Sequence, residues 1–76
     1  MASQPRVRFT DYALFRMRQR DILEGDVRLV LERPLSGHRR RPDGRSEVVG
    51  RIGTRRLLVV YRRRVRDVLV INAMWE

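Results

Sequence analysis

The sequence predicts an α+β domain in which two N-terminal helices pack on one face of a three- to four-stranded antiparallel sheet. Three features predict this fold: two segments with apolar residues at helical spacing come first, a proline ends the second of them, and apolar runs of strand length follow. Helices followed by a run of strands favour one sheet with the helices gathered on one side. A length of 76 residues corresponds to one domain.

The N-terminal residues are expected to lie outside the domain. Residues 1–8 are polar and include Pro5, which predicts a short flexible arm. The single domain is then expected over residues 9–76.

The two helices are expected over residues 10–20 and 24–33. Thr10 or Asp11 can cap the first helix, because a side-chain oxygen there accepts a hydrogen bond from a backbone N–H that has no partner within the helix. Pro34 ends the second helix, because the residue before a proline is disfavoured in the α conformation.

After the helices, the sequence predicts a loop and three strands. Residues 35–46 combine glycine and proline with a basic run, so we expect a mobile surface loop or the rim of a site, in which a short strand can begin. Strands are expected over residues 47–52, 57–61 and 67–75, with a basic hairpin over residues 62–66. The last strand is apolar on both faces, which is typical of a central strand or of one covered by a partner.

The charge of the chain is its strongest functional signal. Arginine accounts for all 18 basic residues, against 9 acidic ones, and the formal net charge is +9. A genome that favours arginine codons explains the missing lysine but not the excess of positive charge. Arginine binds phosphate through a planar pair of N–H donors and stacks on bases, so the excess predicts a polyanionic partner, with RNA the leading candidate and an acidic protein the other.

The composition argues against several other classes of protein. The absence of cysteine excludes disulfides and thiolate metal sites, and one histidine, His38, is too few for a zinc site, so we expect no metal and no cofactor. No apolar run approaches the ~18 residues of a membrane span, and the N-terminus lacks the apolar core of a signal peptide. We therefore expect a cytoplasmic protein with no membrane partner.

The first half of the chain carries a series of short motifs: Thr10-Asp11-Tyr12-Ala13, Arg16-Met17, Arg20-Asp21-Ile22, Asp26-Val27 and Pro34. This series resembles a family of small bacterial proteins within the RelE/ParE-like toxin superfamily, and the resemblance extends from Phe9 to Trp75. It implies two helices packed on a curved antiparallel sheet. It also implies a toxin of a type II toxin–antitoxin pair, since many members cut mRNA on the ribosome and others poison DNA gyrase. Tyr12 stands where the family usually has histidine, and Asp21 where it usually has glycine.

Cleavage of RNA without a metal requires a base for the ribose 2′-hydroxyl, a cation for the phosphorane and an acid for the leaving 5′-oxygen. The sequence suggests a concave sheet surface lined by arginines with an acid–base group nearby, formed by Arg45, Arg51, Arg56 and Arg62 with Tyr61, Glu47 or His38. The catalytic candidates are Tyr61, as a base or a stacking platform, and Arg51, Arg56 and His38. Successive strand residues point to opposite faces, so Tyr61 and Arg62 are not expected on the same face. The alternative is a solvated sheet face with surface arginines.

A second set of arginines is expected to bind nucleic-acid phosphate, and it consists of Arg45, Arg62, Arg63, Arg64 and Arg66. Most of these lie in the predicted hairpin of residues 62–66. Such a run is also typical of a solvated turn that only steers a polyanion by long-range attraction.

Three functions remain open at the level of sequence. The first is a toxin-like RNA-binding protein, either non-enzymatic or a metal-independent, ribosome-dependent mRNA endonuclease. The second is a non-catalytic basic module that docks an acidic antitoxin-like protein, the ribosome or nucleic acid. The third is a helix-turn-helix DNA binder, which the strands after Pro34 argue against. In addition, we place Val68, Val70 and Met74 on an outer face of the last strand, and an exposed apolar face predicts a homodimer or an antitoxin complex.

Overall fold

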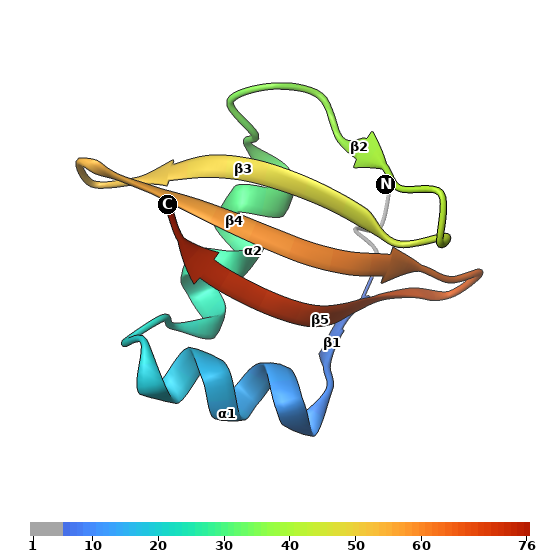
Figure 1. Cartoon of the computed structure of the whole chain (residues 1–76), viewed down its shortest axis with the longest axis horizontal. Helices are drawn as coiled ribbons and strands as arrows, with labels where there is room; N and C mark the ends of the chain where they lie inside the picture. Colours follow the sequence, from blue (N-terminus) through green and yellow to red (C-terminus); the bar gives the residue numbers. More distant parts are fainter. Residues whose placement is uncertain (1–5) are drawn as a thin grey trace.

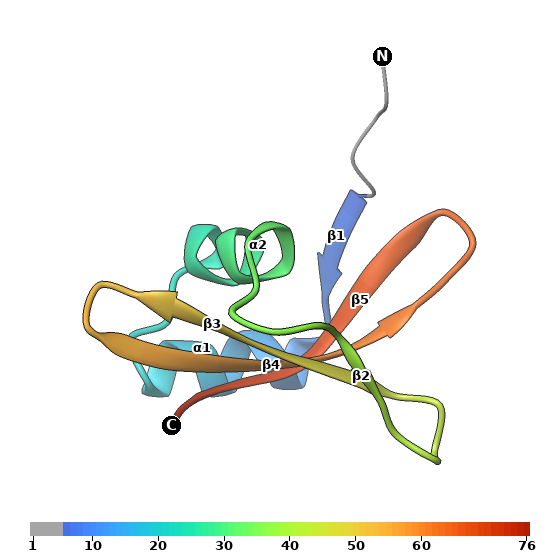
Figure 2. The same ribbon diagram turned by 90° about the horizontal axis from the view of Figure 1, so that it is seen from above.

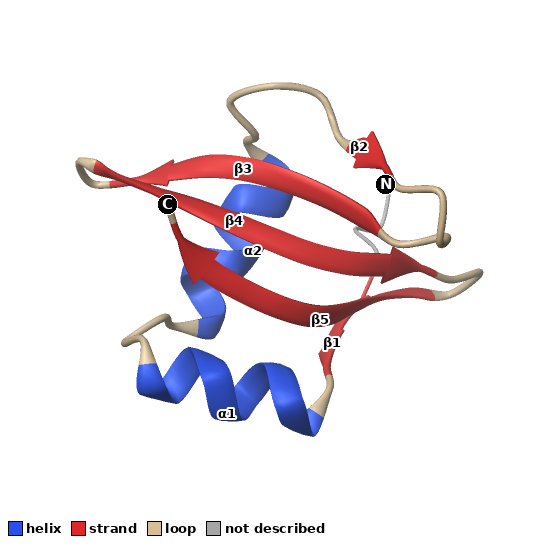
Figure 3. Ribbon diagram, in the orientation of Figure 1, coloured by secondary structure: helices blue, strands red, loops and turns tan. Residues whose placement is uncertain are grey.

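The structure, a computed structural model, describes residues 6–76. Along these residues the chain forms, in order, β1 (Arg6–Phe9), α1 (Asp11–Gln19), α2 (Glu24–Glu32), β2 (Arg39–Arg40), β3 (Ser46–Ile52), β4 (Arg55–Arg63) and β5 (Asp67–Trp75). Figure 3 shows that a long loop joins α2 to β2, whereas short turns join β3, β4 and β5. The two predicted helices and the three predicted strands are therefore present, and the last strand has the predicted bounds.

The sheet differs from the predicted one in its number of strands and in their direction. Over residues 6–76 it has five strands in the order β1-β5-β4-β3-β2, and β1 pairs with β5 in parallel, so the sheet is mixed. The prediction of two helices on a three- to four-stranded antiparallel sheet is wrong. The prediction missed β1 because this strand has only four residues, in which two arginines alternate with Val7 and Phe9. So short and basic a segment resembles a polar arm when only the sequence is considered. Of that predicted arm, residues 6–8 belong to β1, and residues 1–5 lie outside the described residues.

Local side chains determine where the helices begin. Thr10 Oγ1 accepts a hydrogen bond from the backbone N–H of Ala13 at 3.0 Å, which confirms Thr10 as the N-cap of α1. In α2 the carboxylate of Asp26 accepts from the backbone N–H of Leu23 at 3.1 Å. α1 packs against β5, and α2 packs against β3 and β4. Neither of these two helices covers the sheet face turned toward the viewer in Figure 1, and Figure 2 shows the same arrangement from above. Neither described helix has the length and apolar character needed to cross a bilayer.

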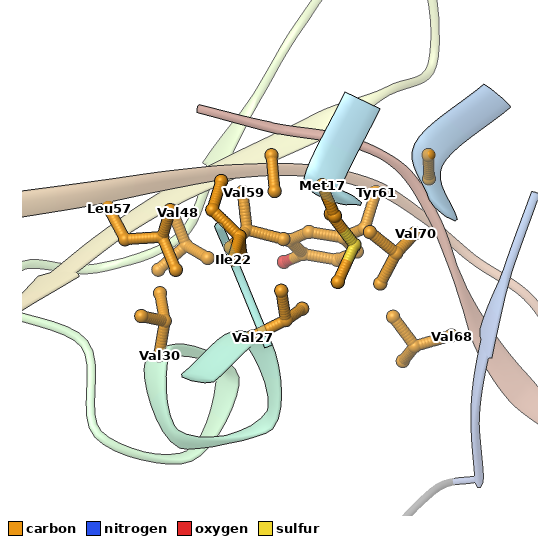
Figure 4. Close-up of a cluster of buried hydrophobic side chains, with 12 residues drawn as sticks. Met17, Ile22, Val27, Val30, Val48, Leu57, Val59, Tyr61, Val68 and Val70 are labelled. Atoms are coloured by element: carbon orange, nitrogen blue, oxygen red, sulfur yellow. The ribbon is translucent and has the colours of Figure 1, made fainter. Parts of the chain in front are cut away.

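The core lies between the helices and the sheet. Its largest fully buried side chains come from both layers, and they are Tyr61, Met17, Leu57, Val27, Val30, Val48, Val59 and Val70. Figure 4 shows the Tyr61 ring within this apolar cluster. The burial of a tyrosine here matters for function, because the core then determines where its hydroxyl group points.

Two residues that the sequence placed on an outer face belong to this core instead. Val68 and Val70 are 5% and 0% exposed, whereas Met74 lies on the opposite face of the sheet. The cause is an irregularity in the pairing of β4 with β5. On β4, Val60 pairs with Asn72 but the next residue, Tyr61, pairs with Val70, so Ile71 is an extra residue in β5. Strict alternation along β5 therefore assigned the wrong face to the two valines, on which the expected homodimer face mainly depended.

Candidate phosphate-binding and catalytic site

The strongest candidate site is centred on Tyr61 and His38. Tyr61 follows Leu57 and Val59 on the core face of β4 with the strand period of two, and only 2% of its surface is exposed. Its hydroxyl group shares a hydrogen bond with Nδ1 of His38, and the two rings meet edge to face with centroids 5.6 Å apart. A buried tyrosine usually has such a partner for its hydroxyl group. The structure thus brings together two of the four residues predicted to be catalytic.

The loop after α2 places His38 beside Tyr61. The backbone N–H of Leu35 donates to the carbonyl oxygen of Val49 at 2.9 Å, which ties the start of the loop to β3. Directly after His38, the short strand β2 pairs with β3 on the side away from β4. The loop is therefore anchored to β3 before and after His38, and the neighbouring β4 carries Tyr61, although the two residues are 23 positions apart in the sequence.

The surroundings of His38 favour its neutral form. Burial lowers the pKa of the imidazole, and the nearby positive charge of Arg63 lowers that pKa further. The hydrogen bond with Tyr61 occupies Nδ1 and leaves Nε2 available to a ligand. A neutral imidazole held in one orientation is the form that a general base requires.

Two cavities meet at this pair of residues. The larger, of about 610 Å³, is lined by three apolar side chains, Val7, Leu31 and Val68, and by the charged side chains of Arg6, Arg28, Glu32 and Arg63. The smaller, of about 340 Å³, is lined by Arg40, Gly44 and Ser46. His38, Tyr61 and Arg63 line both cavities, and we call these three residues the shared wall. A ligand that contacts the shared wall can extend into either cavity.

The arginines of the cavities differ in the partners they already have. Arg28 lies 3.7 Å from Glu24, one turn earlier in α2. Within residues 6–76, no acidic side chain lies within ion-pair distance of Arg6, Arg40 or Arg63. An arginine without an ion-pair partner keeps its N–H donors free for a phosphate group, so these three residues are the strongest candidates for binding an anion.

The fold divides the predicted catalytic residues between two faces of the sheet. Arg51 and Arg56 lie directly opposite each other on β3 and β4, and both are exposed. Strand alternation places them on the face opposite to Tyr61, so they do not reach the shared wall.

Among the arginines of the β4–β5 hairpin, Arg63 alone lines the cavities. The guanidinium of Arg64 donates to both carboxylate oxygens of Asp67 at 2.5 and 2.7 Å, and this hydrogen-bonded pair lowers the pKa of the Asp67 carboxyl. Arg66 is exposed in the turn. The predicted basic run thus contributes one residue to the site and one to the structure of the hairpin.

Three further predicted residues lie outside both cavities. Arg62 is on the outer sheet face, next to Tyr61 in sequence but on the other side of β4, as strand alternation predicts. Arg45 lies 3.8 Å from Asp43 in the turn before β3. Glu47, the predicted acid or base, lies 3.7 Å from Arg41.

Three charged residues that line the larger cavity were not predicted from the sequence: Arg6, Arg28 and Glu32. Arg40, which lines the smaller cavity, lies in the basic run of residues 35–46 for which the rim of a site was one expectation. Arg28 and Glu32 carried a usable signal, since they lie four residues apart beside Leu31 and therefore share one face of α2. Arg6 carried none, because its place at the cavity depends on the pairing of β1 with a strand at the far end of the chain.

No family model, curated protein or solved structure matches the chain. The functional interpretation therefore depends on the arrangement of its own side chains. In the part of the chain that the structure describes, no group of three or more His, Asp or Glu side chains could hold a metal ion.

Proposed function

We propose that this protein binds RNA at the two cavities and cuts it at the shared wall. The observation that carries the proposal is the hydrogen bond between His38 and the buried Tyr61 hydroxyl, at the place where both cavities meet. It combines an oriented titratable group with arginines that have no acidic partner, and metal-independent phosphoryl transfer requires both. The net charge of +9 adds long-range attraction for a polyanion.

In the proposed reaction, the ribose 2′-oxygen attacks the adjacent phosphorus. Nε2 of His38 accepts the proton of the 2′-hydroxyl group, while Arg63 donates to the phosphate oxygens and stabilises the charge of the phosphorane. The bond from phosphorus to the 5′-oxygen then breaks, and that oxygen takes the proton from the imidazolium through solvent. The products are a 2′,3′-cyclic phosphate and a 5′-hydroxyl end.

Tyr61 has a positioning role in this reaction. Its ring is 2% exposed, so it offers no free face on which a base could stack. Its hydroxyl group instead holds one nitrogen of the imidazole and so sets the direction of the other. His38 is buried only in part and keeps much of its surface exposed, so it is the residue that contacts the substrate.

The motifs between Thr10 and Pro34 resemble those of a family of small bacterial proteins within the RelE/ParE-like superfamily, many members of which cut mRNA on the ribosome. This resemblance supports ribosome-bound mRNA as the substrate and an acidic antitoxin as the partner. The measurement is translation in a cell-free bacterial system with a labelled mRNA, with and without the protein. New ends within the reading frame are the expected result, and they should form faster with ribosomes than on free RNA.

A matched set of variants tests the site itself, on labelled RNA in the presence of a chelator. His38→Ala is expected to reduce the cleavage rate by ~100-fold or more, since it removes the general base. Tyr61→Phe keeps the buried ring and should lower kcat while KM for RNA stays the same. Arg66→Ala, outside both cavities, is the control and should cut at the normal rate. Full activity of His38→Ala would contradict the proposal, as would intact RNA with the unmodified protein both with and without ribosomes.

A second function, docking of an acidic protein without catalysis, is favoured by the outer face of the sheet. Arg51, Arg56 and Arg62 lie there beside the half-buried apolar side chains of Leu58 and Met74. Within residues 6–76, none of these arginines lies within ion-pair distance of an acidic side chain. An apolar strip edged by such arginines fits an acidic amphipathic segment.

The two functions are separated by a charge reversal on the outer face. The double variant R51E/R56E should still cut RNA if the shared wall is catalytic. The alternative outcome has two parts: neither the wild type nor any variant cuts RNA, and a co-expressed acidic antitoxin-like protein binds the wild type but not R51E/R56E. In that case the docking function replaces the catalytic one.

A further inference from the structure

We infer that the larger cavity receives a guanine base of the bound RNA, beside the phosphate held at the shared wall. This inference rests on the proposed function for the presence of an RNA chain. The choice of base rests on the side chains that line the cavity.

The apolar side chains indicate which cavity takes the base. Val7, Leu31 and Val68 line the larger cavity and come from three different elements, whereas the smaller cavity has Arg40, Gly44 and Ser46 in their place. A nucleobase has apolar faces and polar edges, and a phosphate is polar throughout. The larger cavity, at about 610 Å³, also falls within the size range of sites that enclose small organic groups. The base is therefore assigned to the larger cavity and the next phosphate to the smaller one.

A carboxylate among the arginines shows that the larger cavity is not simply a second phosphate site. Glu32 lines it, and within residues 6–76 no arginine lies within ion-pair distance of this residue. A carboxylate accepts hydrogen bonds and repels phosphate oxygens. Its presence beside Arg6 and Arg28 therefore calls for a ligand that offers donors at one edge and acceptors at another.

Guanine offers this combination. Its Watson–Crick edge presents two adjacent donors, N1–H and the exocyclic amino group, which the two oxygens of the Glu32 carboxylate can accept together. Its O6 and N7 are acceptors for an arginine such as Arg6 or Arg28. Adenine, cytosine and uracil each place an acceptor next to the donor on that edge, and the acceptor would face the carboxylate.

The test uses the four nucleoside monophosphates GMP, AMP, CMP and UMP, with binding followed by calorimetry and by the ring resonances of His38, the only histidine in the chain. GMP is expected to bind ~10-fold or more tightly than the other three, as a bidentate contact to one base allows. Glu32→Gln should remove most of this preference, because the amide replaces one acceptor by a donor. Inorganic phosphate should bind Glu32→Gln at least as tightly as the wild type, because the removed carboxylate repels phosphate.

The control is Asp21→Asn, which removes an exposed carboxylate that lines neither of these two cavities. Asp21 has a φ of 55°, a conformation that asparagine adopts readily, so the variant should keep the fold and the preference for GMP. Equal affinity for the four nucleotides overturns the inference. A GMP preference that survives in Glu32→Gln also overturns it.

Two oligoribonucleotides of equal length, one with a single guanine and one with none, separate this inference from the proposed function. If both are bound and cut equally well, the guanine site is wrong and the nuclease stands. If neither is bound or cut while GMP keeps its Glu32-dependent preference, the guanine site stands and the nuclease is wrong. The expected result is binding and cutting at the single guanine, with Glu32→Gln losing the difference between the two RNAs.

Discussion

His38 owes its chemical character to two residues that are distant from it in the sequence. Tyr61 occupies one ring nitrogen through its hydroxyl group, and burial together with the charge of Arg63 lowers the pKa of the ring. A loop histidine next to a run of arginines has no such properties by sequence alone, since they arise from neighbours on β4.

The titration of His38 should show this effect directly. We expect NMR of the imidazole to give a pKa below the ordinary histidine value of about 6.5. Arg63→Gln removes a positive charge and should raise the pKa of His38, whereas Arg66→Gln should leave it unchanged. An unchanged pKa in Arg63→Gln would assign the whole effect to burial and would argue against Arg63 at the shared wall.

The same shift determines how stability and activity depend on pH. Because the folded protein binds this proton less readily than the unfolded chain, the contribution of His38 to stability is fully present above about pH 6.5 and is lost as the pH falls through the lowered pKa. The cleavage rate should rise with pH through that lowered pKa, since the base acts in its neutral form.

Among the elements, α2 and β3 approach each other at a glycine. A Cβ atom at Gly50 would lie 2.8 Å from Cγ2 of Val30, a side chain that is 1% exposed. The absence of a side chain at Gly50 therefore lets α2 lie close to the sheet. This position matters for the site because α2 also carries Arg28 and Glu32.

Gly50→Ala should destabilise the fold by about 1–3 kcal/mol, because the new methyl group overlaps a packed side chain. Gly25→Ala is the matched control: nothing lies within 4 Å of its added Cβ, and alanine in a helix should stabilise the protein by about 0.5–1 kcal/mol. Chemical denaturation measures both changes. Combining Gly50→Ala with Val30→Ala should recover part of the loss if the overlap is its cause, and strictly additive losses would exclude that cause.

At the scale of the whole molecule, the sheet brings together two segments that are far apart in the sequence, β1 and β5. β1 pairs with β5 in parallel, and Arg8 lies 3.4 Å from Asp67 across that pair. The same pairing brings Arg6 and Val7 to the larger cavity. The candidate site therefore collects residues from all five described strands, from α2 and from the loop after it, and it exists only when the whole domain is folded.

The dependence of RNA affinity on salt should reveal which arginines of this basic molecule contact phosphate. For a single strand, each phosphate contact contributes about 0.7 to the slope of log affinity against log salt concentration. Arg63→Ala and Arg40→Ala should each reduce the slope by about that amount, whereas Arg66→Ala should change it much less. Equal slopes for all three variants would indicate that the net charge attracts RNA without contact at the cavities.

The sequence alone determines those features that short stretches of residues encode. Thr10 caps α1, and the spacing of apolar residues predicts both helices and three strands. The arginine excess predicts a polyanionic partner, and the residue types of His38 and Tyr61 make both of them candidate site residues. Periodicity, caps and turns depend on near neighbours in the chain, so they can be read without a three-dimensional structure.

The tertiary structure alone decided the parallel pairing of β1, the faces of Val68 and Val70, and the meeting of His38 with Tyr61. Each depends on contacts between residues far apart in sequence. The pairing needs the exposed edge of β5, the faces depend on one extra residue in that strand, and the His38 contact needs a loop tied to β3. Such contacts form only when the core packs, because their stability comes from burial and pairing across the domain and not from the propensity of any one segment.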